Sequence, residues 1–385
     1  MKKLLVISRN FPPLVGGMER LVFNIYKQLN NRFDCDLVGP RDSTRHVSGN
    51  HNVYECPLSP LPAFIITALL KSSKAVVNNN YSACIAGSGV TAPVALLASR
   101  LRKIPCITFV HGLDLIVRNH VYQKLFVPAI RRSDVIIANS ANTARLAEEA
   151  GVDPDRIRIL HPGVHIPKTI DSLTSFRDCH QLHSRRILLS VGRLIPRKGL
   201  AEFISRSLPA IVSALPDTLL VIIGTEPKNA LQREDSETRR IMDTIREQQL
   251  ENHVLMIGRV DDDTLQAAFS ESDLFVFPLR AVAGDVEGFG MVAVEAAALG
   301  LPCIAFAEGG VADAIDAGQS GFLISSGDYQ SFSQTVIDIL QGTLERPSPD
   351  SCRKHAARFQ WETFGDKLTD IISSVIDQVP ANNYE

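Results

Sequence analysis

Two carboxylates stand eight positions apart in the run DVEGFGMVAVEAAALGLP at 285–302. Glu287 precedes two glycines, and Glu295 follows within a small, apolar stretch. Glycines let a backbone approach a ligand closely, and amide groups at the start of the expected helix favour anions such as phosphate. Ribose hydroxyls would satisfy a buried Glu295, although a half-exposed residue that only favours the helix dipole is the alternative. The pair predicts a site for a sugar linked to a nucleotide.

Cations and glycines follow other predicted strands. Arg193 and Lys198 come after the run RILLSVG, and two cations on one loop can hold adjacent phosphates, although such pairs are more often only solvated. Gly16 and Gly17 follow the first strand and precede a helix that begins near Met18. Amides there could face a phosphate, although a plain turn fits as well, and the pattern is not the dinucleotide fingerprint GxGxxG.

Two further groups of residues raise the question of a metal. The run Asp261–Asp263 is similar to an acidic metal-binding element, but it directly precedes TLQAAFS and fits a helix cap better. His161 and His165 are four apart, yet Pro162 and Gly163 rule out the helix that would pair them. The zinc-protease motif HExxH does not occur. We therefore expect no metal.

Strand-like runs alternate with helix-length segments in two series. The first ends near residue 165, a polar, irregular stretch follows at 166–184, and the second series fills 185–360. This alternation predicts an α/β protein of two Rossmann-like domains with doubly wound parallel sheets. Ligands bind outside the carboxyl ends of such strands, so two facing domains would create a cleft. The final helical stretch lies within 361–385.

Length and composition agree with a globular protein. The chain has 385 residues, enough for two cores, with 45% hydrophobic and 21% charged residues. The opening MKKLLVIS runs into Arg9, Asn10 and two prolines rather than a cleavage site, so it predicts a strand. The apolar run 61–70 is half as long as a membrane span. Seven dispersed cysteines without a CxxC pair indicate reduced thiols and a cytoplasmic location.

Charge is distributed unevenly along the chain. Residues 1–165 hold 20 Lys and Arg against 11 Asp and Glu, whereas residues 166–385 hold 20 against 31. A basic half could attract an anionic membrane surface or an acidic substrate. Scattered cations and 6% aromatics disfavour nucleic acid. Segment 60–77 joins an apolar run to Lys71 and Lys74; such a stretch is usually a core helix, and interfacial contact with lipid is the alternative.

A family resemblance joins these observations. The run EGFGMVAVEA at 287–296 resembles the donor-site motif of retaining glycosyltransferases with the GT-B fold, particularly family 4, also called group 1. This resemblance implies transfer of a sugar from a UDP- or GDP-linked donor to an acceptor hydroxyl, with a lipid-linked or cell-envelope glycan as a candidate acceptor. Five more matching segments stand in the family order: PPLVGG at 12–17, HGLD at 111–114, HPGV at 161–164, GRLIPRKG at 192–199 and GGVADAI at 309–315.

The resemblance also implies that domain 1–165 binds the acceptor, that domain 185–360 binds the nucleotide sugar, and that the helix within 361–385 crosses back to the first domain. It implies roles for individual residues as well. His111 and Glu287 would be catalytic, with His111 near the reacting carbon, Glu287 on the donor sugar and Glu295 on the ribose. Arg193 and Lys198 would hold the diphosphate, whose developing negative charge they could stabilise without a metal or another cofactor. Asp114 fits the same element as His111, or only holds a turn, and Arg197 is not singled out. The other donor-binding positions are Gly16, Gly17, Arg259, Val260, Gly288, Phe289, Gly290, Met291 and Val292.

Three alternatives remain at this stage. A nucleotide-sugar epimerase on the same fold is disfavoured by the GGMER loop and the EGFG element. A non-catalytic two-domain sugar-binding protein is disfavoured by the cationic diphosphate site and by the lack of an export signal in this sequence. A dehydrogenase shares doubly wound domains, but GxGxxG is missing after both first strands. Peripheral membrane contact through the basic half is a further expectation.

Overall fold

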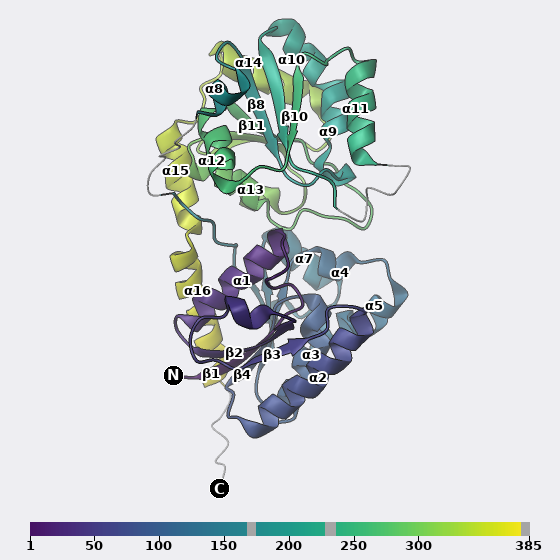
Figure 1. The fold of residues 1–385 in the computed structure, drawn as a ribbon, viewed down its shortest axis with the longest axis vertical. Coiled ribbons are helices and arrows are strands. Elements are labelled where there is room, and N and C mark those ends of the chain that lie inside the picture. Colours follow the sequence, from purple (N-terminus) through teal and green to yellow (C-terminus); the bar gives the residue numbers. More distant parts are fainter. Residues whose placement is uncertain (168–174, 228–235, 379–385) are drawn as a thin grey trace. The chain divides into compact units, whose positions relative to one another are not determined.

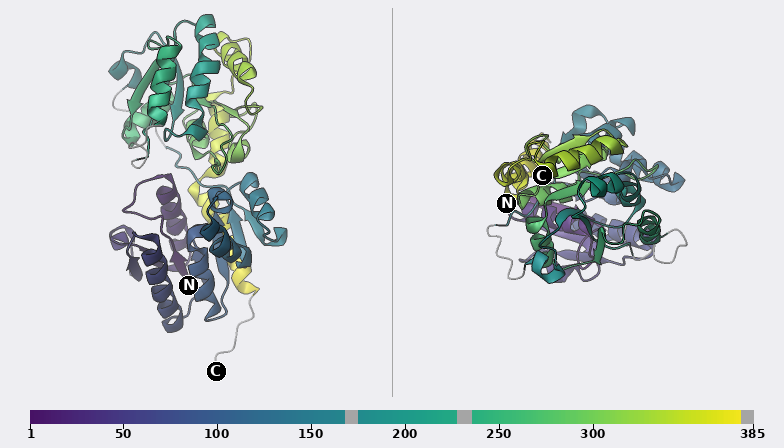
Figure 2. Two further views of the ribbon diagram at one scale, coloured as in Figure 1. Left: turned by 90° about the vertical axis from the view of Figure 1, so that its right-hand side faces the viewer. Right: turned by 90° about the horizontal axis from the view of Figure 1, so that it is seen from above.

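The computed structural model describes residues 1–167, 175–227 and 236–378. The chain forms two compact units: unit 1 comprises Met1–Gly163 and Trp361–Glu385, and unit 2 comprises Val164–Gln360. Each unit is a parallel sheet with helices on both faces (Figures 1 and 2). The predicted fold of two parallel-sheet α/β domains is confirmed.

Unit 1 contains a seven-stranded sheet with the order β3-β2-β1-β4-β5-β6-β7. Its strands are nearly continuous apolar runs because both faces of a parallel sheet are buried. The strand order reverses between β1 and β4, which is the position where open α/β sheets bind ligands. The strands are β1 (Lys3–Ile7), β2 (Asp34–Pro40), β3 (Val53–Cys56), β4 (Ala83–Ala86), β5 (Cys106–Val110), β6 (Val135–Ala138) and β7 (Ile157–Ile159). The helices are α1 (Gly17–Asn30), α2 (Leu61–Asn78), α3 (Ala92–Arg100), α4 (Leu113–Ile116), α5 (His120–Leu125), α6 (Val127–Arg132), α7 (Ala141–Glu149) and α16 (Trp361–Asp377).

Unit 2 contains a six-stranded parallel sheet with the order β10-β9-β8-β11-β12-β13. The order reverses between β8 and β11, so the carboxyl ends of these two strands form the equivalent ligand-binding position. The strands are β8 (Arg186–Val191), β9 (Thr218–Ile223), β10 (Val254–Gly258), β11 (Leu274–Phe277), β12 (Cys303–Phe306) and β13 (Gly321–Ile324). The helices are α8 (Phe176–His180), α9 (Leu200–Arg206), α10 (Leu208–Ala214), α11 (Glu237–Glu247), α12 (Asp262–Glu271), α13 (Met291–Ala298), α14 (Tyr329–Gln341) and α15 (Pro349–Ala356).

The structure differs from the sequence-based expectations in one segment. The stretch 166–184 contains helix α8 in unit 2, capped by Ser175, whereas residues 168–174 lie outside the described part. Helix α8 has five residues, too few for a hydrophobic period to reveal it. By contrast, helix α2 agrees with the helix expected over 60–77, since it continues past the apolar run 61–70 as far as Asn78.

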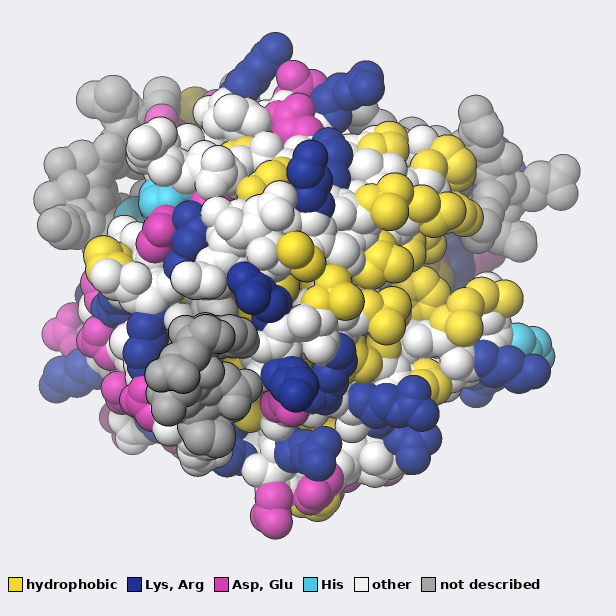
Figure 3. Space-filling model, turned by 90° about the horizontal axis from the view of Figure 1, so that it is seen from below, with side chains coloured by type: hydrophobic (Ala, Val, Ile, Leu, Met, Phe, Trp, Pro, Cys, Tyr) yellow, Lys and Arg dark blue, Asp and Glu magenta, His cyan; other side chains and the backbone are white. Residues whose placement is uncertain are grey.

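Exposed hydrophobic side chains are concentrated in unit 1. Among the described residues, Met242 is the single large exposed hydrophobic of unit 2. Unit 1 exposes Leu61, Ile66, Leu70 and Val77 of α2 and Leu97 of α3, together with Leu101 directly after α3. Figure 3 shows a band of hydrophobic side chains bordered by Lys and Arg side chains. Scattered surface hydrophobics are ordinary, but a contiguous band indicates an interaction site.

Candidate functional site

Two loops pack closely at the carboxyl ends of β8 and β11 in unit 2. Gly199 has φ 66°, and a Cβ atom there would overlap the carbonyl oxygen of Pro278. The Arg280 backbone N–H donates to the Arg197 carbonyl at 3.0 Å. Only glycine permits this approach without strain. The contact places the loop after β8 against the loop after β11, where a ligand of this unit is expected.

A buried cluster of four charged side chains joins these loops. The Glu287 carboxylate accepts a hydrogen bond from Lys198 Nζ at 2.8 Å and another from Arg197 Nη1, both on Oε2. Arg197 Nε lies 3.1 Å from Asp285 Oδ1. The side chains of Arg197, Lys198 and Glu287 are 7%, 13% and 17% exposed. Buried charges require such partners, so the cluster is assembled before any ligand arrives.

Burial and neighbouring charges shift two pKa values within this cluster. Burial alone would raise the pKa of Glu287, but the charges of Lys198 and Arg197 hold it below its usual value. Burial lowers the pKa of Lys198; Glu287 opposes this shift, whereas the positive charges of Arg197 and Arg193 add to it. The Lys198 ammonium also lies 4.5 Å from the centroid of the Phe277 ring. An anionic ligand would therefore stabilise its charged form.

The start of helix α13 adds an anion-binding element next to Glu287. Gly290, the residue before the helix, has φ 92° and provides no side-chain cap. Amides of an uncapped first turn can donate to a phosphate. The Glu287 carbonyl accepts from the Gly310 N–H at 2.8 Å, and a Cβ at Gly309 would lie 2.6 Å from the same carbonyl oxygen. The glycine pair after β12 thereby fixes the backbone that carries Glu287.

The other predicted donor residues occupy different environments. Arg193 is exposed on the loop after β8, and its charge reaches Lys198. Glu295 is half-buried within α13. Phe289 is 2% exposed and packs against Phe359 with ring centroids 5.5 Å apart, so only its backbone can contact a ligand. Gly288, Met291 and Val292 lie at the start of α13 and are partly buried.

Arg259 and Val260 follow the edge strand β10, two strands away from β8. No contact among the described residues joins them to the Arg197–Glu287 cluster. Asp261, next in the chain, accepts a hydrogen bond from the Thr264 N–H at 2.8 Å and caps helix α12. The predicted capping role of this acidic run is confirmed.

In unit 1, Gly16 precedes helix α1 and Gly17 is its first residue. A Cβ at Gly16 would overlap the Glu19 carboxylate, which also accepts a hydrogen bond from Asn10 Nδ2 at 2.8 Å. The loop after β1 is thus closely packed around Glu19, and no side chain caps the start of α1. Its backbone amides are the groups that a phosphate could use.

His111 follows β5 and is 6% exposed. Its Nε2 lies 3.0 Å from the Gly87 carbonyl oxygen, which can only accept, so Nε2 carries the hydrogen. In the neutral ring Nδ1 then presents a lone pair, and this buried atom has no hydrogen-bond partner among the described residues. Asp114 accepts from the His111 N–H at 3.0 Å and holds the turn; burial raises the pKa of Asp114 despite the nearby His111.

Two residues beside His111 were missed by the sequence analysis. Register pairs Val110 with Ala138, so His111 and Asn139 leave neighbouring strands side by side. Ser88 follows Gly87, the residue that His111 contacts. Asn139 Oδ1 and Ser88 Oγ are buried and, within the described ranges, lack hydrogen-bond partners. Ser88, His111 and Asn139 are all polar residues that follow an apolar strand. The sequence analysis used this pattern to identify His111 but not the other two. We call Ser88, His111 and Asn139 the unit 1 polar group.

Arg197 and Asp285 were also missed, although Arg197 is the most buried cation of the charged cluster. Sequence reasoning treats a charged loop residue as solvated unless a motif marks it. The packing of the loop after β8 onto the loop after β11 buries Arg197, and no local pattern reveals that contact.

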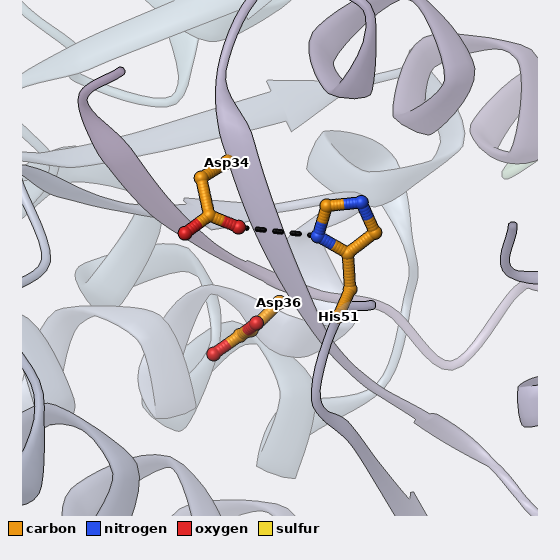
Figure 4. Close-up of side chains that lie close together, drawn as sticks. All are labelled: Asp34, Asp36 and His51. Carbon is orange, nitrogen blue, oxygen red and sulfur yellow. Dashed lines mark hydrogen bonds and ion pairs between the residues drawn. The ribbon is translucent and has the colours of Figure 1, made fainter. Parts of the chain in front are cut away.

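One group of side chains in unit 1 has the composition of a metal site. Oxygen and nitrogen atoms of Asp34, Asp36 and His51 lie within 4.8 Å of one another (Figure 4). However, Lys3 Nζ lies 3.1 Å from carboxylate oxygens of both Asp34 and Asp36, so a cation of the protein already occupies the position between them and offsets part of their charge. The group lies where β1 and β2 begin, at the opposite edge of the sheet from the unit 1 polar group. Its observed contacts make it an internal ion-pair network.

Asp36 is the centre of this network and is fully buried. Burial would raise its pKa, but hydrogen bonds from Tyr81, Asn52 and Lys3 lower it. We expect Asp36→Ala to destabilise unit 1 by about 3–5 kcal/mol, because the buried Tyr81 hydroxyl, Asn52 and the Lys3 ammonium lose their acceptor. The corresponding melting transition should fall by roughly 6–20 °C in calorimetry.

The half-exposed Asp34 supplies the control, since Asp34→Ala should cost about 1 kcal/mol or less. A lowered folded-state pKa also means that the Asp36 contribution is present above the unfolded value, about 3.9, and is lost as pH falls through the folded value. Equal melting temperatures for the parent and Asp36→Ala would contradict the network.

Comparisons with known proteins now bear on the whole chain. Residues 175–359 match the family model "Glycosyl transferases group 1", and residues 15–167 match "Glycosyltransferase Family 4". The chain is 25% identical to the GDP-mannose-dependent monoacylated alpha-(1-6)-phosphatidylinositol monomannoside mannosyltransferase of Corynebacterium glutamicum, over 97% of this chain and 98% of that protein. It is 24% identical to the corresponding GDP-mannose-dependent alpha-(1-6)-phosphatidylinositol monomannoside mannosyltransferase of Mycolicibacterium smegmatis, over 96% and 98%.

Solved structures share the fold. Anabaena HepE in complex with UDP superposes with a TM-score of 0.76 at 21% identity, covering 97% of this chain and all of that one. Sucrose-phosphate synthase from Thermosynechococcus elongatus gives 0.74 at 19% identity, covering 98% and 100%. The two family models together cover most of both units and all the motifs considered above, except the first three residues of PPLVGG. The chain therefore belongs to the group 1 glycosyltransferases with the GT-B fold, which transfer a sugar from a nucleotide sugar.

Proposed function

We propose that this glycosyltransferase retains the anomeric configuration of the donor sugar and works without a metal ion. The observation that carries the proposal is the buried cluster of Arg197, Lys198 and Glu287 beside the uncapped start of α13. The leaving nucleoside diphosphate gains negative charge as the glycosidic bond breaks. Fixed cations and amides aimed at that charge stabilise the transition state more than the ground state.

Glu287 has two tasks in this proposal. Both cations contact Oε2, which leaves Oε1 outside these ion pairs for a hydroxyl of the donor sugar. The same carboxylate fixes Lys198 in position and supports its positive charge. Arg193, exposed on the same loop, adds a further cation for the diphosphate, and Glu295 binds the ribose hydroxyls.

The unit 1 polar group fits sugar hydroxyls. His111 Nδ1 and Asn139 Oδ1 both accept hydrogen bonds, and a phosphate offers no donor hydrogen to them when fully ionised. Sugar hydroxyls donate and accept, so they can pair with both atoms and with Ser88 Oγ. We assign this group to a hydroxyl of the sugar substrates next to the reacting carbon.

The names of the two mannosyltransferase relatives support GDP-mannose as the first donor to test and a phosphoinositide-type glycolipid as the first acceptor class. The HepE complex makes UDP-glucose the second donor. A lipid-linked or cell-envelope glycan acceptor would suit an enzyme at the cytoplasmic face of a membrane. Six of the seven cysteines are buried and all are free thiols, as a reducing compartment requires.

The direct test measures thermal stabilisation of the protein by GDP, UDP and ADP. A nucleotide at 100 times its dissociation constant adds about 2.7 kcal/mol to the stability of the state that binds it. The nucleotide that stabilises the protein most then determines which labelled nucleotide sugar is used as the donor in transfer assays. NMR of the product reports the anomeric configuration. Failure of all three nucleotides to stabilise the protein, with no turnover of either donor, would sink the proposal. Sugar isomerisation without an acceptor would instead reveal an epimerase.

Metal independence gives a separate prediction. Transfer should continue at about the parent rate in excess EDTA, because protein cations and helix amides already face the diphosphate. The assay should include a parallel reaction with added Mg²⁺ or Mn²⁺. Loss of transfer in EDTA that either ion restores would show that a metal supplies the missing charge.

A further inference from the structure

Helix α2 is unusual for a helix that packs on a sheet. It is long and apolar enough to cross a membrane by length and composition alone, yet only 28% of it is buried inside the protein. Its buried side includes Phe64 and Ala68, both fully enclosed against the unit 1 sheet. The helix therefore cannot leave unit 1 to span a bilayer without opening that core. Its apolar outer side needs another explanation.

The outer side of α2 carries exposed apolar side chains on one helical face, with Ser73 and Lys74 between Leu70 and Val77. Ile66, Leu70 and Val77 follow one another at spacings of four and seven residues, which places them on one helical face. Ile66 is 59% and Leu70 66% exposed. The apolar surface continues with Leu97 of the neighbouring helix α3 and with Leu101 directly after that helix, each 54% exposed. We call these five side chains the α2–α3 face.

Hydrogen bonds tie the two parts of this face together. Arg102 Nε donates to the Val76 carbonyl at 3.3 Å, and Arg102 Nη2 donates to the Val77 carbonyl at 3.2 Å. Leu101 therefore lies beside the end of α2 that carries Val77. The band of hydrophobic side chains in Figure 3 is consistent with this continuity.

The charge around the face is mainly positive, although Glu55 lies near Lys71 and Asp134 near Arg100. From Cys56 to Leu113 the sequence contains no Asp or Glu, whereas five cations fall within this stretch. Lys74 and Lys103 are exposed and make no ion pair with any described residue, and Arg100 is exposed with Asp134 at 3.5 Å. The full set of cations is Lys71, Lys74, Arg100, Arg102 and Lys103.

We propose that the α2–α3 face docks onto an anionic lipid bilayer, with Ile66, Leu70, Val77, Leu97 and Leu101 entering the headgroup boundary and the surrounding cations contacting acidic headgroups. An interfacial helix has this combination of an apolar side and flanking Lys and Arg. Each well-placed cation contributes about 1 kcal/mol at an anionic surface, which corresponds to roughly a fivefold change in affinity. A second copy of this chain would bring the same positive charge to the contact and is disfavoured.

Vesicle flotation of the full chain tests the proposal without any enzymatic assay. Vesicles contain either phosphatidylcholine alone or phosphatidylcholine with phosphatidylglycerol. We expect the protein to float with the mixed vesicles, to remain behind with neutral ones, and to dissociate as salt is raised. Failure to bind the anionic vesicles, or equal binding to both compositions, overturns the proposal.

Two double variants separate the contributions. Ile66→Gln with Leu70→Gln should weaken vesicle affinity at least about tenfold by removing exposed apolar area. Lys74→Gln with Lys103→Gln should weaken it roughly twentyfold or more. Met242→Gln and Lys354→Gln, exposed residues of unit 2, serve as matched controls and should bind as the parent does. Parent-like binding by both double variants would contradict the assigned face.

Analytical sedimentation of the parent and of the double variant Ile66→Gln with Leu70→Gln tests whether a second copy of this chain binds the α2–α3 face instead. A dimer that this variant converts to a monomer, without vesicle binding by the parent, would assign the face to a second copy of the chain instead. Stabilisation by nucleoside diphosphate should be unchanged in every variant, since the charged cluster lies in unit 2. Vesicle binding therefore tests the docking proposal, and nucleotide stabilisation tests the proposed function. Either proposal can fail while the other holds.

Discussion

Replacing Lys198 by alanine should lower kcat/KM for sugar transfer by roughly ten- to a hundredfold or more. The ammonium contributes charge-assisted hydrogen bonds, worth about 1.5–3 kcal/mol each, to a diphosphate whose charge grows in the transition state. Its loss also leaves Glu287 with Arg197 as its remaining partner in the cluster, so the carboxylate repels an incoming diphosphate more strongly. Steady-state kinetics at limiting and saturating donor measure both effects.

Two companion variants define the specificity of that effect. Arg193→Ala should reduce kcat/KM less than Lys198→Ala, roughly tenfold, because Arg193 is exposed and solvent screens its charge. Lys354→Ala removes an exposed lysine of unit 2 outside the cluster and should leave transfer unchanged. Folding of each variant is checked by circular dichroism. Activity of Lys198→Ala equal to that of the parent at every donor concentration would remove Lys198 from the diphosphate site.

The fold could be predicted from the sequence because its signal is local and repeated. Runs such as LLVIS, CITFV and LLVII are apolar on both sides, as strands of a covered parallel sheet must be, and each meets a helix-length segment. Helix α8 escaped this reasoning because five polar-rich residues carry no period. Helix α2 was expected over 60–77 and spans Leu61–Asn78, because Lys71, Ser72 and Ser73 after the apolar run do not break a helix.

The candidate site was predictable only to the extent that its residues carry a motif or follow a strand. Lys198 and Glu287 were identified separately, as a diphosphate ligand and a sugar ligand, but their 2.8 Å contact joins loops that are 89 residues apart. Arg197 was set aside because its burial depends on the approach of Gly199 to Pro278. Asn139 and Ser88 became recognisable once strand register placed them beside His111. Tertiary proximity of this kind has no local sequence signal.

The contact between Glu287 and two cations predicts that Glu287→Gln affects nucleoside diphosphate binding and sugar transfer differently. In Glu287→Gln, Arg197 and Lys198 lose a buried countercharge, so the unliganded protein should be destabilised by about 3–5 kcal/mol. A nucleoside diphosphate can replace the missing negative charge. Its affinity should therefore be equal to or higher than that of the parent, whereas sugar transfer should fall at least about a hundredfold because the sugar contact and the position of Lys198 are both lost.

Glu295→Gln should show the opposite pattern. Its proposed partner is the ribose, so loss of the charge-assisted bonds should weaken binding of the bare nucleoside diphosphate by roughly tenfold. Titration calorimetry of both variants with one nucleoside diphosphate, together with melting curves with and without it, measures the affinities and the stabilities. Glu345→Gln, an exposed glutamate of unit 2, is the control for an isolated charge change. Equal losses of diphosphate affinity in the Glu287 and Glu295 variants would show that Glu287 binds the nucleotide directly and that its role in orienting Lys198 is misassigned.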